Sequence, residues 1–237
     1  MFQTFLVQPI YNVFVALVGV MPHGDTGLAI IGLTFLMRLV LYPIFTASIR
    51  TQMGMAAMQG ELDTLKEKYK NDKEQAAREQ LALFKKYKVN PLAGFGALFV
   101  QFAVIIALYL ALFHEGFPDI NTELLYSFVS VPNAVSTNFF GLINLLEPKN
   151  VILALIVGLT QYLAIRLTLA RTPALASAHP DKVAMHNMQQ GMMLYFMPAL
   201  MAVASYFLAA AVGLYFVAGN IFSLGQEWII RRQGQQK

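Results

Sequence analysis

The chain of 237 residues contains no cysteine and little charge, since only 13% of its residues are Asp, Glu, Lys or Arg. Without cysteine it forms no disulfide, offers no thiol nucleophile and lacks the lipobox that a lipid anchor requires. The low charge accompanies 57% hydrophobic residues and a mean hydropathy of +0.55. This composition excludes an ordinary soluble domain and indicates an integral membrane protein.

Catalytic and metal-binding motifs are also missing from the sequence. It has no nucleophile elbow, no phosphate-binding glycine loop and no HExxH pattern. The histidines fall at or beyond the ends of the apolar runs and lack metal-ligand spacing: His23, His114, His179 and His186. A basic pI in a membrane protein reflects topology. We therefore expect no enzyme, no cofactor, no metal and no direct nucleic-acid recognition.

Against this background one charge is conspicuous, because Arg38 lies in the middle of the apolar run from Gly27 to Ile49. About 20 such residues suffice to span a bilayer as a helix. An arginine at the bilayer centre costs roughly 2.5–3.5 kcal/mol on insertion scales and does not lose its proton. The guanidinium must therefore face water or a partner inside the membrane, which makes Arg38 a functional-site candidate.

The sequence predicts a single all-α domain with five transmembrane helices, a cytoplasmic helical hairpin and an N-terminal interfacial helix. Residues 1–24 are expected to lie at the outer interface, although an additional span over residues 1–21 is an open alternative. Gly191 to Ile230 is too long for one span and is expected to fold back near Ala209 to Gly213. The expected spans are 27–49, 92–113, 151–170, 190–208 and 212–230. The expected connections are a hairpin at 51–90, an outer connection at 114–150 with a short helix after Asn121, a loop at 171–188 and a tail at 231–237.

Two helical stripes predict that the hairpin packs along one seam. The first stripe is Met55, Met58, Leu62, Leu65 and Tyr69, and the second is Ala77, Leu81, Phe84 and Lys88. Methionines recur on surfaces that accept varied apolar partners. Met53, Met55 and Met58 are therefore candidate contacts for an apolar partner, although a seam between two helices is the favoured interpretation.

Orientation follows from the basic residues. All of the 17 lysines and arginines except Arg38 and Lys149 lie in or near alternate connections and the tail. These connections are therefore expected to be cytoplasmic, which places the N-terminus outside and the C-terminus inside the cell.

Uncharged polar residues on several spans accompany Arg38, and Asp and Glu are absent from mid-span positions. The candidates for a polar groove around Arg38 are Thr34, Gln101, Gln161, Asn220, Ser223 and Gln226. Thr34, Arg38 and Tyr42 would share one face of a straight helix. Each amide or hydroxyl also has the simpler interpretation of a hydrogen bond between helices.

Four stretches resemble the YidC-type membrane protein insertases of bacteria, in their short form. They are GLAIIGLTFLMRLVLYP (27–43), ELDTLKEKYKNDKEQAAREQLALFKKYKVNPLAG (61–94), GLTQYLAIRLT (158–168) and GLYFVAGNIFSLGQEWIIRR (213–232). The resemblance implies a groove open to cytoplasm and lipid, with Arg38 as the groove arginine and Gln161 and Asn220 at polar positions. The large extracytoplasmic domain of the Gram-negative form and the lipoprotein signal of the Gram-positive form have no counterpart here, and the short tail argues against a ribosome-binding extension.

The resemblance further implies insertion and folding of nascent membrane proteins in the bacterial cell (inner or plasma) membrane, alone or with the Sec translocon. Ribosomes and signal-recognition components would meet the cytoplasmic side. Two other functions fit the residues: a small-solute transporter or channel with an anion-attracting arginine, and a membrane scaffold. Transporters often contain inverted repeats, and no such repeat is found in this sequence.

Overall fold

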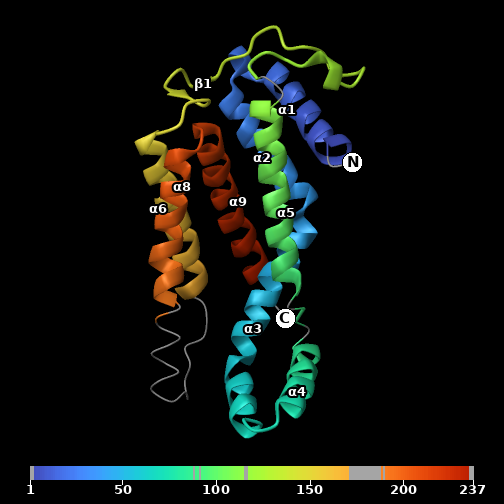
Figure 1. The fold of residues 1–237 in the computed structure, drawn as a ribbon, viewed down its shortest axis with the longest axis vertical. Coiled ribbons are helices and arrows are strands. Elements are labelled where there is room, and N and C mark those ends of the chain that lie inside the picture. The colour runs from blue at the N-terminus through green and yellow to red at the C-terminus, as the bar shows by residue number, and fades with distance from the viewer. Residues whose placement is uncertain are drawn as a thin grey trace.

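A computed structural model describes residues 3–87, 89–90, 92–114, 117–170, 188 and 190–234. Most of them form long helices that run side by side (Figure 1). The α-helices are α1 (Gln8–Val20), α2 (Thr26–Val40), α3 (Tyr42–Lys68), α4 (Lys73–Lys86), α5 (Leu92–Tyr109), α6 (Val151–Ala170), α8 (Met197–Phe207) and α9 (Ala210–Gly234). The short elements are η1 (Gln3–Val7), η2 (Pro22–Gly24), η3 (Leu110–His114), η4 (Thr122–Leu124), η5 (Met192–Phe196), β1 (Asn138–Phe139) and β2 (Ile143–Asn144).

Length and apolarity qualify two of the described helical stretches as membrane spans, Gln3–Val20 and Val151–Leu169. Thr26–Val40 and Tyr42–Met55 qualify together as a third, bent span, and two further apolar helices, Phe99–His114 and Met192–Phe207, are shorter. The described residues thus form a largely helical membrane protein, while the expected number of five spans stays a prediction.

The segment expected as one straight span, 27–49, is broken at Leu41. α2 ends at Val40, and the helix axis turns by 69° before it continues as α3. Pro43 explains the break, because a proline disfavours helical geometry in the residue before it and cannot donate a backbone hydrogen bond. Arg38 therefore lies in the last turn of α2 and not at the centre of a straight helix.

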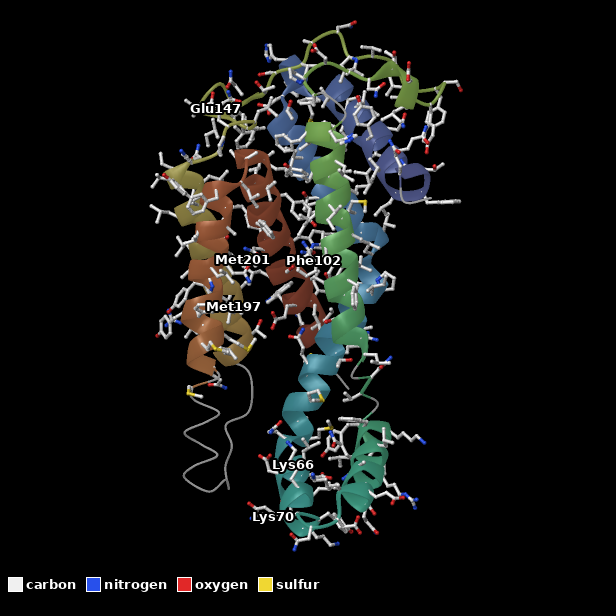
Figure 2. All side chains as sticks on the ribbon, in the orientation of Figure 1. Lys66, Lys70, Phe102, Glu147, Met197 and Met201 are labelled. Carbon is white, nitrogen blue, oxygen red and sulfur yellow. The ribbon has the colours of Figure 1, made fainter. Side chains whose placement is uncertain are left out.

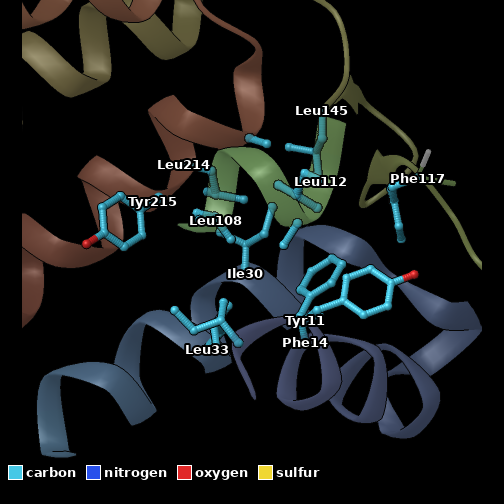
Figure 3. Close-up of a cluster of buried hydrophobic side chains, with 14 of the residues drawn as sticks. Tyr11, Phe14, Ile30, Leu33, Leu108, Leu112, Phe117, Leu145, Leu214 and Tyr215 are labelled. Carbon is cyan, nitrogen blue, oxygen red and sulfur yellow. The ribbon is translucent and has the colours of Figure 1, made fainter. Parts of the chain in front are cut away.

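The main hydrophobic core joins α1, α2, α5 with η3, and the start of α9 (Figure 3). Tyr11, Phe14 and Ile30 are completely buried in it, as are Leu112 and Leu145. Burial of one such side chain is worth about 1.5–3 kcal/mol. This core lies toward the end of the helices that is uppermost in Figure 1, and the polar residues of α2 and α9 lie below it.

The connection before α6 lies across the same end of the helices (Figure 1). The short helix expected after Asn121 is present as η4, and the Asn121 side chain caps it by accepting a hydrogen bond from the backbone N–H of Glu123. Asp25 is buried and accepts hydrogen bonds from the N–H groups of Gly27 and Phe140. These bonds tie the start of α2 to the β1–β2 hairpin, which the sequence did not predict.

α3 and α4 pack side by side below the core (Figure 1). Their seam buries Met58 and Leu62 of α3 against Leu83 and Val89. Of the stripe expected on the second helix, Phe84 packs against this seam, whereas Leu81 is 59% exposed and Leu83 is buried instead. Lys88 lies outside the described residues. The apolar positions of α4 are few, so its phase depends on the partner helix rather than on its own pattern.

The long C-terminal apolar run folds back where α8 ends at Phe207 and α9 begins at Ala210. α6 packs against both of these helices. Gly213 permits the tight return, because a Cβ there would lie 2.5 Å from Oγ of Ser205. The hairpin of α8 and α9 thereby places the polar face of α9 between α6 and α2.

Candidate functional site

The guanidinium of Arg38 is held between four helices. Its Nη2 donates a hydrogen bond to Oε1 of Gln101 on α5 over 3.3 Å. Its Cζ lies 4.3 Å from the ring centroid of Phe45 on α3, a cation–π contact. Gly219 of α9 permits the close approach, since a Cβ there would lie 3.1 Å from Nη2. Within the described residues no carboxylate forms an ion pair with Arg38.

A second hydrogen bond continues from Gln101 to α9. Its Nε2 donates to the hydroxyl oxygen of Tyr215 over 2.9 Å. Tyr215 is buried at the edge of the hydrophobic core (Figure 3). The series Arg38–Gln101–Tyr215 therefore connects three helices and fixes the orientation of the Gln101 amide.

Two adjoining cavities surround Arg38, with volumes of about 430 and 270 Å³. We call the two together the Arg38 groove. Residues that line both cavities are Arg38, Phe45, Ser48, Gln52, Gln161 and Asn220. The larger cavity extends toward α5 and to Met201 on α8, which Figure 2 labels. The smaller one extends along α6 and α9. Charged, amide, hydroxyl and apolar side chains thus meet in one space.

The structure brings most of the expected polar residues to this groove. Gln161, Asn220, Ser223 and Gln226 line the smaller cavity, and Gln101 lines the larger one. Thr34 lines neither cavity. It is 2% exposed, and its hydroxyl donates to the carbonyl oxygen of Ile30 on its own helix. Thr34 and Arg38 both lie on α2, but Tyr42 lies on α3 beyond the break at Leu41, so the face expected for the three residues is not continuous.

Several groove amides also join helices. The Nε2 of Gln226 donates to the hydroxyl of Thr46 over 3.0 Å and to the carbonyl oxygen of Tyr42 over 3.3 Å. Nδ2 of Asn220 donates to the Thr160 hydroxyl over 3.2 Å. The Ser223 hydroxyl donates to the carbonyl oxygen of Gly219. Gln226 and Asn220 therefore position α9 against α3 and α6 in addition to lining the groove, whereas the Ser223 bond stays within α9.

The most important groove residue that sequence reasoning missed is Glu227. It lines the smaller cavity together with Arg38, and its Oε2 accepts a hydrogen bond from Thr168 on α6 over 2.8 Å. A carboxylate is conspicuous in a sequence only in the middle of a span, and Glu227 lies near the end of the last expected one. Tyr215 and Phe45 were missed as well, because only the folded contacts bring them to the amide and the guanidinium.

The three methionines of the first hairpin helix lie outside the groove. Met58 is fully buried in the seam between α3 and α4, and Met55 packs against that seam. Met53 is half-buried, and it lines neither cavity. The seam interpretation therefore holds for Met58, which has no exposed surface to offer a client.

The apolar helices and the polar groove between them define a helical membrane protein. Residues 18–237 match the model of the family described as 60Kd inner membrane protein. The chain is 30% identical over 234 residues to the membrane protein insertase YidC of Oceanobacillus iheyensis, covering 97% of this chain and 83% of that protein. It is 29% identical to the membrane protein insertase YidC 1 of Halalkalibacterium halodurans, covering 88% and 70% of the two chains. It is 32% identical to the membrane protein insertase MisCA of Bacillus subtilis, covering 88% and 71%. The chain belongs to the YidC family of membrane protein insertases.

Proposed function

We propose that this protein inserts and folds nascent membrane proteins and that the Arg38 groove receives the polar flank of the inserting segment. The observation that carries the proposal is the cavity that Arg38 shares with Gln161 and Asn220. Family membership supports the insertase activity, since relatives bear the name of membrane protein insertase. The activity requires no enzyme chemistry, because transfer of an apolar segment from water to lipid is itself favourable.

The charge of Arg38 has a defined role in this mechanism. A polar or acidic flank must cross a medium in which charges cost several kcal/mol. In the groove such a flank would meet a guanidinium whose described partners are an amide oxygen and an aromatic ring, both neutral. Because no carboxylate neutralises Arg38 among the described residues, its charge attracts the acidic groups of a client. The apolar part of the client would then leave sideways into lipid.

The topology that fits this role has five spans, an outer N-terminus and a cytoplasmic C-terminus. The concentration of basic residues in α3, α4 and the later polar segments supports this orientation. The α3–α4 hairpin would then project into the cytoplasm, where nascent chains arrive. Residues 3–20 would cover the outer interface, since much of α1 is buried against the core. Ribosomes, signal-recognition components and the Sec translocon would contact the cytoplasmic side or the lipid-facing helices.

Reconstitution in liposomes tests the function directly. The client is a short membrane protein with an acidic outer tail, and the variants are Arg38→Ala and Arg38→Lys. We expect insertion to be lost in the alanine variant and largely rescued by lysine. Arg166→Ala is the matched control, because Arg166 is an exposed arginine of α6 outside both cavities. Full insertion by Arg38→Ala would refute the role of Arg38, and solute flux without insertion would favour a transporter or channel.

Because the chain contains no cysteine, cysteine crosslinking provides a second test without background from native thiols. Single cysteines introduced at Gln161 or Asn220 should crosslink to a cysteine in the polar flank of an arrested client. A cysteine at Ile152, which is 69% exposed at the start of α6, serves as the control. Equal crosslinking at all three positions would contradict passage through the groove.

A further inference from the structure

The tip of the β1–β2 hairpin presents two large apolar side chains to its surroundings. Phe140 is 66% exposed and Leu142 is 86% exposed, and Gly141 lies between them in the chain. The neighbouring side chains of Phe139 and Ile143 instead pack against the main hydrophobic core. A group of exposed large apolar side chains marks a surface that contacts another protein or a membrane.

The backbone of the tip holds these side chains in place. The N–H of Leu142 donates to the carbonyl oxygen of Phe139 over 2.9 Å, which closes the turn. Phe140 has a φ of +50° and Gly141 has a φ of +72°. Positive φ values at a hairpin turn favour Asn, Asp or Gly and are uncommon for a bulky residue. The tip therefore carries a strained phenylalanine where an asparagine would be less strained, which points to a use for the exposed ring.

The hairpin is fixed to the helix ends at which apolar segments begin and end. The N–H of Phe140 donates over 2.9 Å to Oδ2 of Asp25, which is the N-cap residue of α2. After β2, the N–H of Lys149 donates over 2.7 Å to the carbonyl oxygen of Tyr206 in the last turn of α8. The hairpin therefore lies at the ends of α2 and α8, shortly before α6 begins (Figure 1).

This position places the tip at the edge of the hydrocarbon layer. α6 qualifies as a membrane span from Val151 onward, and the side chains of Val151 and Ile152 are exposed. Phe207 at the end of α8 is exposed as well. The apolar tip therefore lies at the same end of the bundle as side chains that face lipid. Phe and Leu are among the side chains that membrane-bound segments bury at the boundary between headgroups and acyl chains.

We propose that the β1–β2 hairpin is a lipid anchor, whose Phe140 and Leu142 side chains insert among the lipids of the leaflet at this end of the bundle. In the proposed topology this is the outer leaflet. Insertion removes apolar surface from water, which is favourable. Because the hairpin is bonded to Asp25 and Tyr206, the depth of its tip also fixes how deep the ends of α2 and α8 lie in the bilayer. Lipid anchoring is independent of the proposed insertase activity.

Tryptophan fluorescence of the full chain in liposomes tests the anchor. Trp228 is the only tryptophan of the sequence, so Trp228→Phe provides a background without indole emission. Phe140→Trp and Leu142→Trp then report on the tip, in phosphatidylcholine vesicles with and without bromine on the acyl chains. We expect both reporters to emit at shorter wavelength than an indole in water and to lose much of their intensity in brominated vesicles. Ile152→Trp on the exposed side of α6 should behave in the same way.

Three further variants serve as controls. Glu79→Trp, at an exposed position of α4, reports on an indole in water and should keep its intensity in brominated vesicles. Leu142→Glu, added to the Phe140→Trp protein, should reduce the loss of intensity, since a carboxylate is costly in hydrocarbon. Asn138→Glu places the same charge on β1 away from the tip and should leave the loss nearly unchanged.

Two outcomes overturn the proposal. If the emission and the bromine quenching at both tip positions equal those of Glu79→Trp, the tip lies in water. If the emission is shifted to shorter wavelength but bromine does not quench it, the tip is covered by protein and not by lipid. In either case the insertase function stands, because its own liposome assay measures client insertion.

Discussion

Gly219 of α9 lies against the guanidinium of Arg38, and a Cβ at this glycine would be 3.1 Å from Nη2. That distance is shorter than an ordinary van der Waals contact, so an alanine would require the guanidinium to shift by a few tenths of an ångström. The absence of a side chain at Gly219 therefore leaves the space on α9 that the Arg38 guanidinium occupies.

Gly219→Leu is expected to disable the groove without removing any polar group. The larger side chain should displace the guanidinium and break its 3.3 Å bond to Gln101. A hydrogen bond to a charged group is worth about 1.5–3 kcal/mol, so we expect a loss of roughly tenfold or more in insertion rate. Liposome insertion of the acidic-tail client measures it. Gly225→Ala on the same helix is the control, because nothing lies within 4 Å of its added Cβ. Normal insertion by Gly219→Leu would show that the position of Arg38 is not critical.

The bond between Gln101 and Tyr215 should contribute to the stability of the helix bundle. Tyr215→Phe removes the hydroxyl that accepts from Nε2 of Gln101. The expected loss is about 1 kcal/mol, and the double variant with Gln101→Leu should lose less than the sum of the two single variants. Unfolding followed by circular dichroism in detergent measures both. Tyr109→Phe, an exposed tyrosine of α5, is the matched control. Strict additivity would mean that the two side chains do not interact.

The α3–α4 seam provides a prediction about packing. Met58→Ala should leave a cavity in a fully buried position and cost about 2–5 kcal/mol, whereas Leu81→Ala should cost little because Leu81 is 59% exposed. Hydrogen–deuterium exchange of the whole protein in nanodiscs should show lost protection in α3 and α4 for the first variant alone. An equal loss of protection in the two variants would restore the stripe expected from the sequence.

The hairpin should also respond to pH. The hydrogen bond from Lys86 lowers the pKa of Glu61, and the bond from Tyr87 acts in the same direction. The hydrogen bond to Glu61 in turn raises the pKa of Lys86. A carboxylate with a depressed pKa stabilises the folded form above its ordinary value of 4.5, and this contribution is lost as the pH falls through the lowered pKa. Lys86 contributes below its ordinary value of 10.5 and loses that contribution as the pH rises through the raised pKa.

Exchange protection of the hairpin, corrected for the intrinsic pH dependence, measures this effect. Protection in the wild type should decline below a pH of about 4.5, whereas Glu61→Gln should show a lower and flatter profile. Both groups are exposed, so the effect should be small and sensitive to salt. Identical profiles for the two proteins would exclude a role of the Glu61–Lys86 pair.

Much of the groove could be predicted from the sequence because intramembrane polar residues are rare and costly. Arg38, Gln161 and Asn220 stand out in apolar runs for that reason, and the structure places all three on one cavity. Thr34 lies on α2 like Arg38, but its hydroxyl donates within its own helix and it lines neither cavity, so helical spacing alone does not place it in the groove. The break at Leu41 had a local signal in Pro43, but a proline alone fixes neither the angle nor the direction of a bend.

Other groove residues had no such signal. Glu227 lies three residues before the end of the expected last span, where a carboxylate is ordinary, and only the contact with Thr168 of a distant helix reveals its position. Gly219 is one of 16 glycines, and its importance depends on which side chain approaches it. The sequence did not predict that Leu83 is buried in place of Leu81, because the two leucines differ only in which one meets α3.

The break at Leu41 allows α3 to tilt as a rigid arm relative to α2. Its first turns supply Phe45, Ser48 and Gln52 to the groove wall, while its far end carries the turn into α4. The arm from Tyr42 to Lys68 is about 40 Å long at 1.5 Å per residue. A change of about 10° in the bend would therefore carry the hairpin tip through about 7 Å and shift the groove wall by only a fraction of that distance. A large movement imposed on the tip by a bound partner would become a small, controlled adjustment of the wall that faces Arg38.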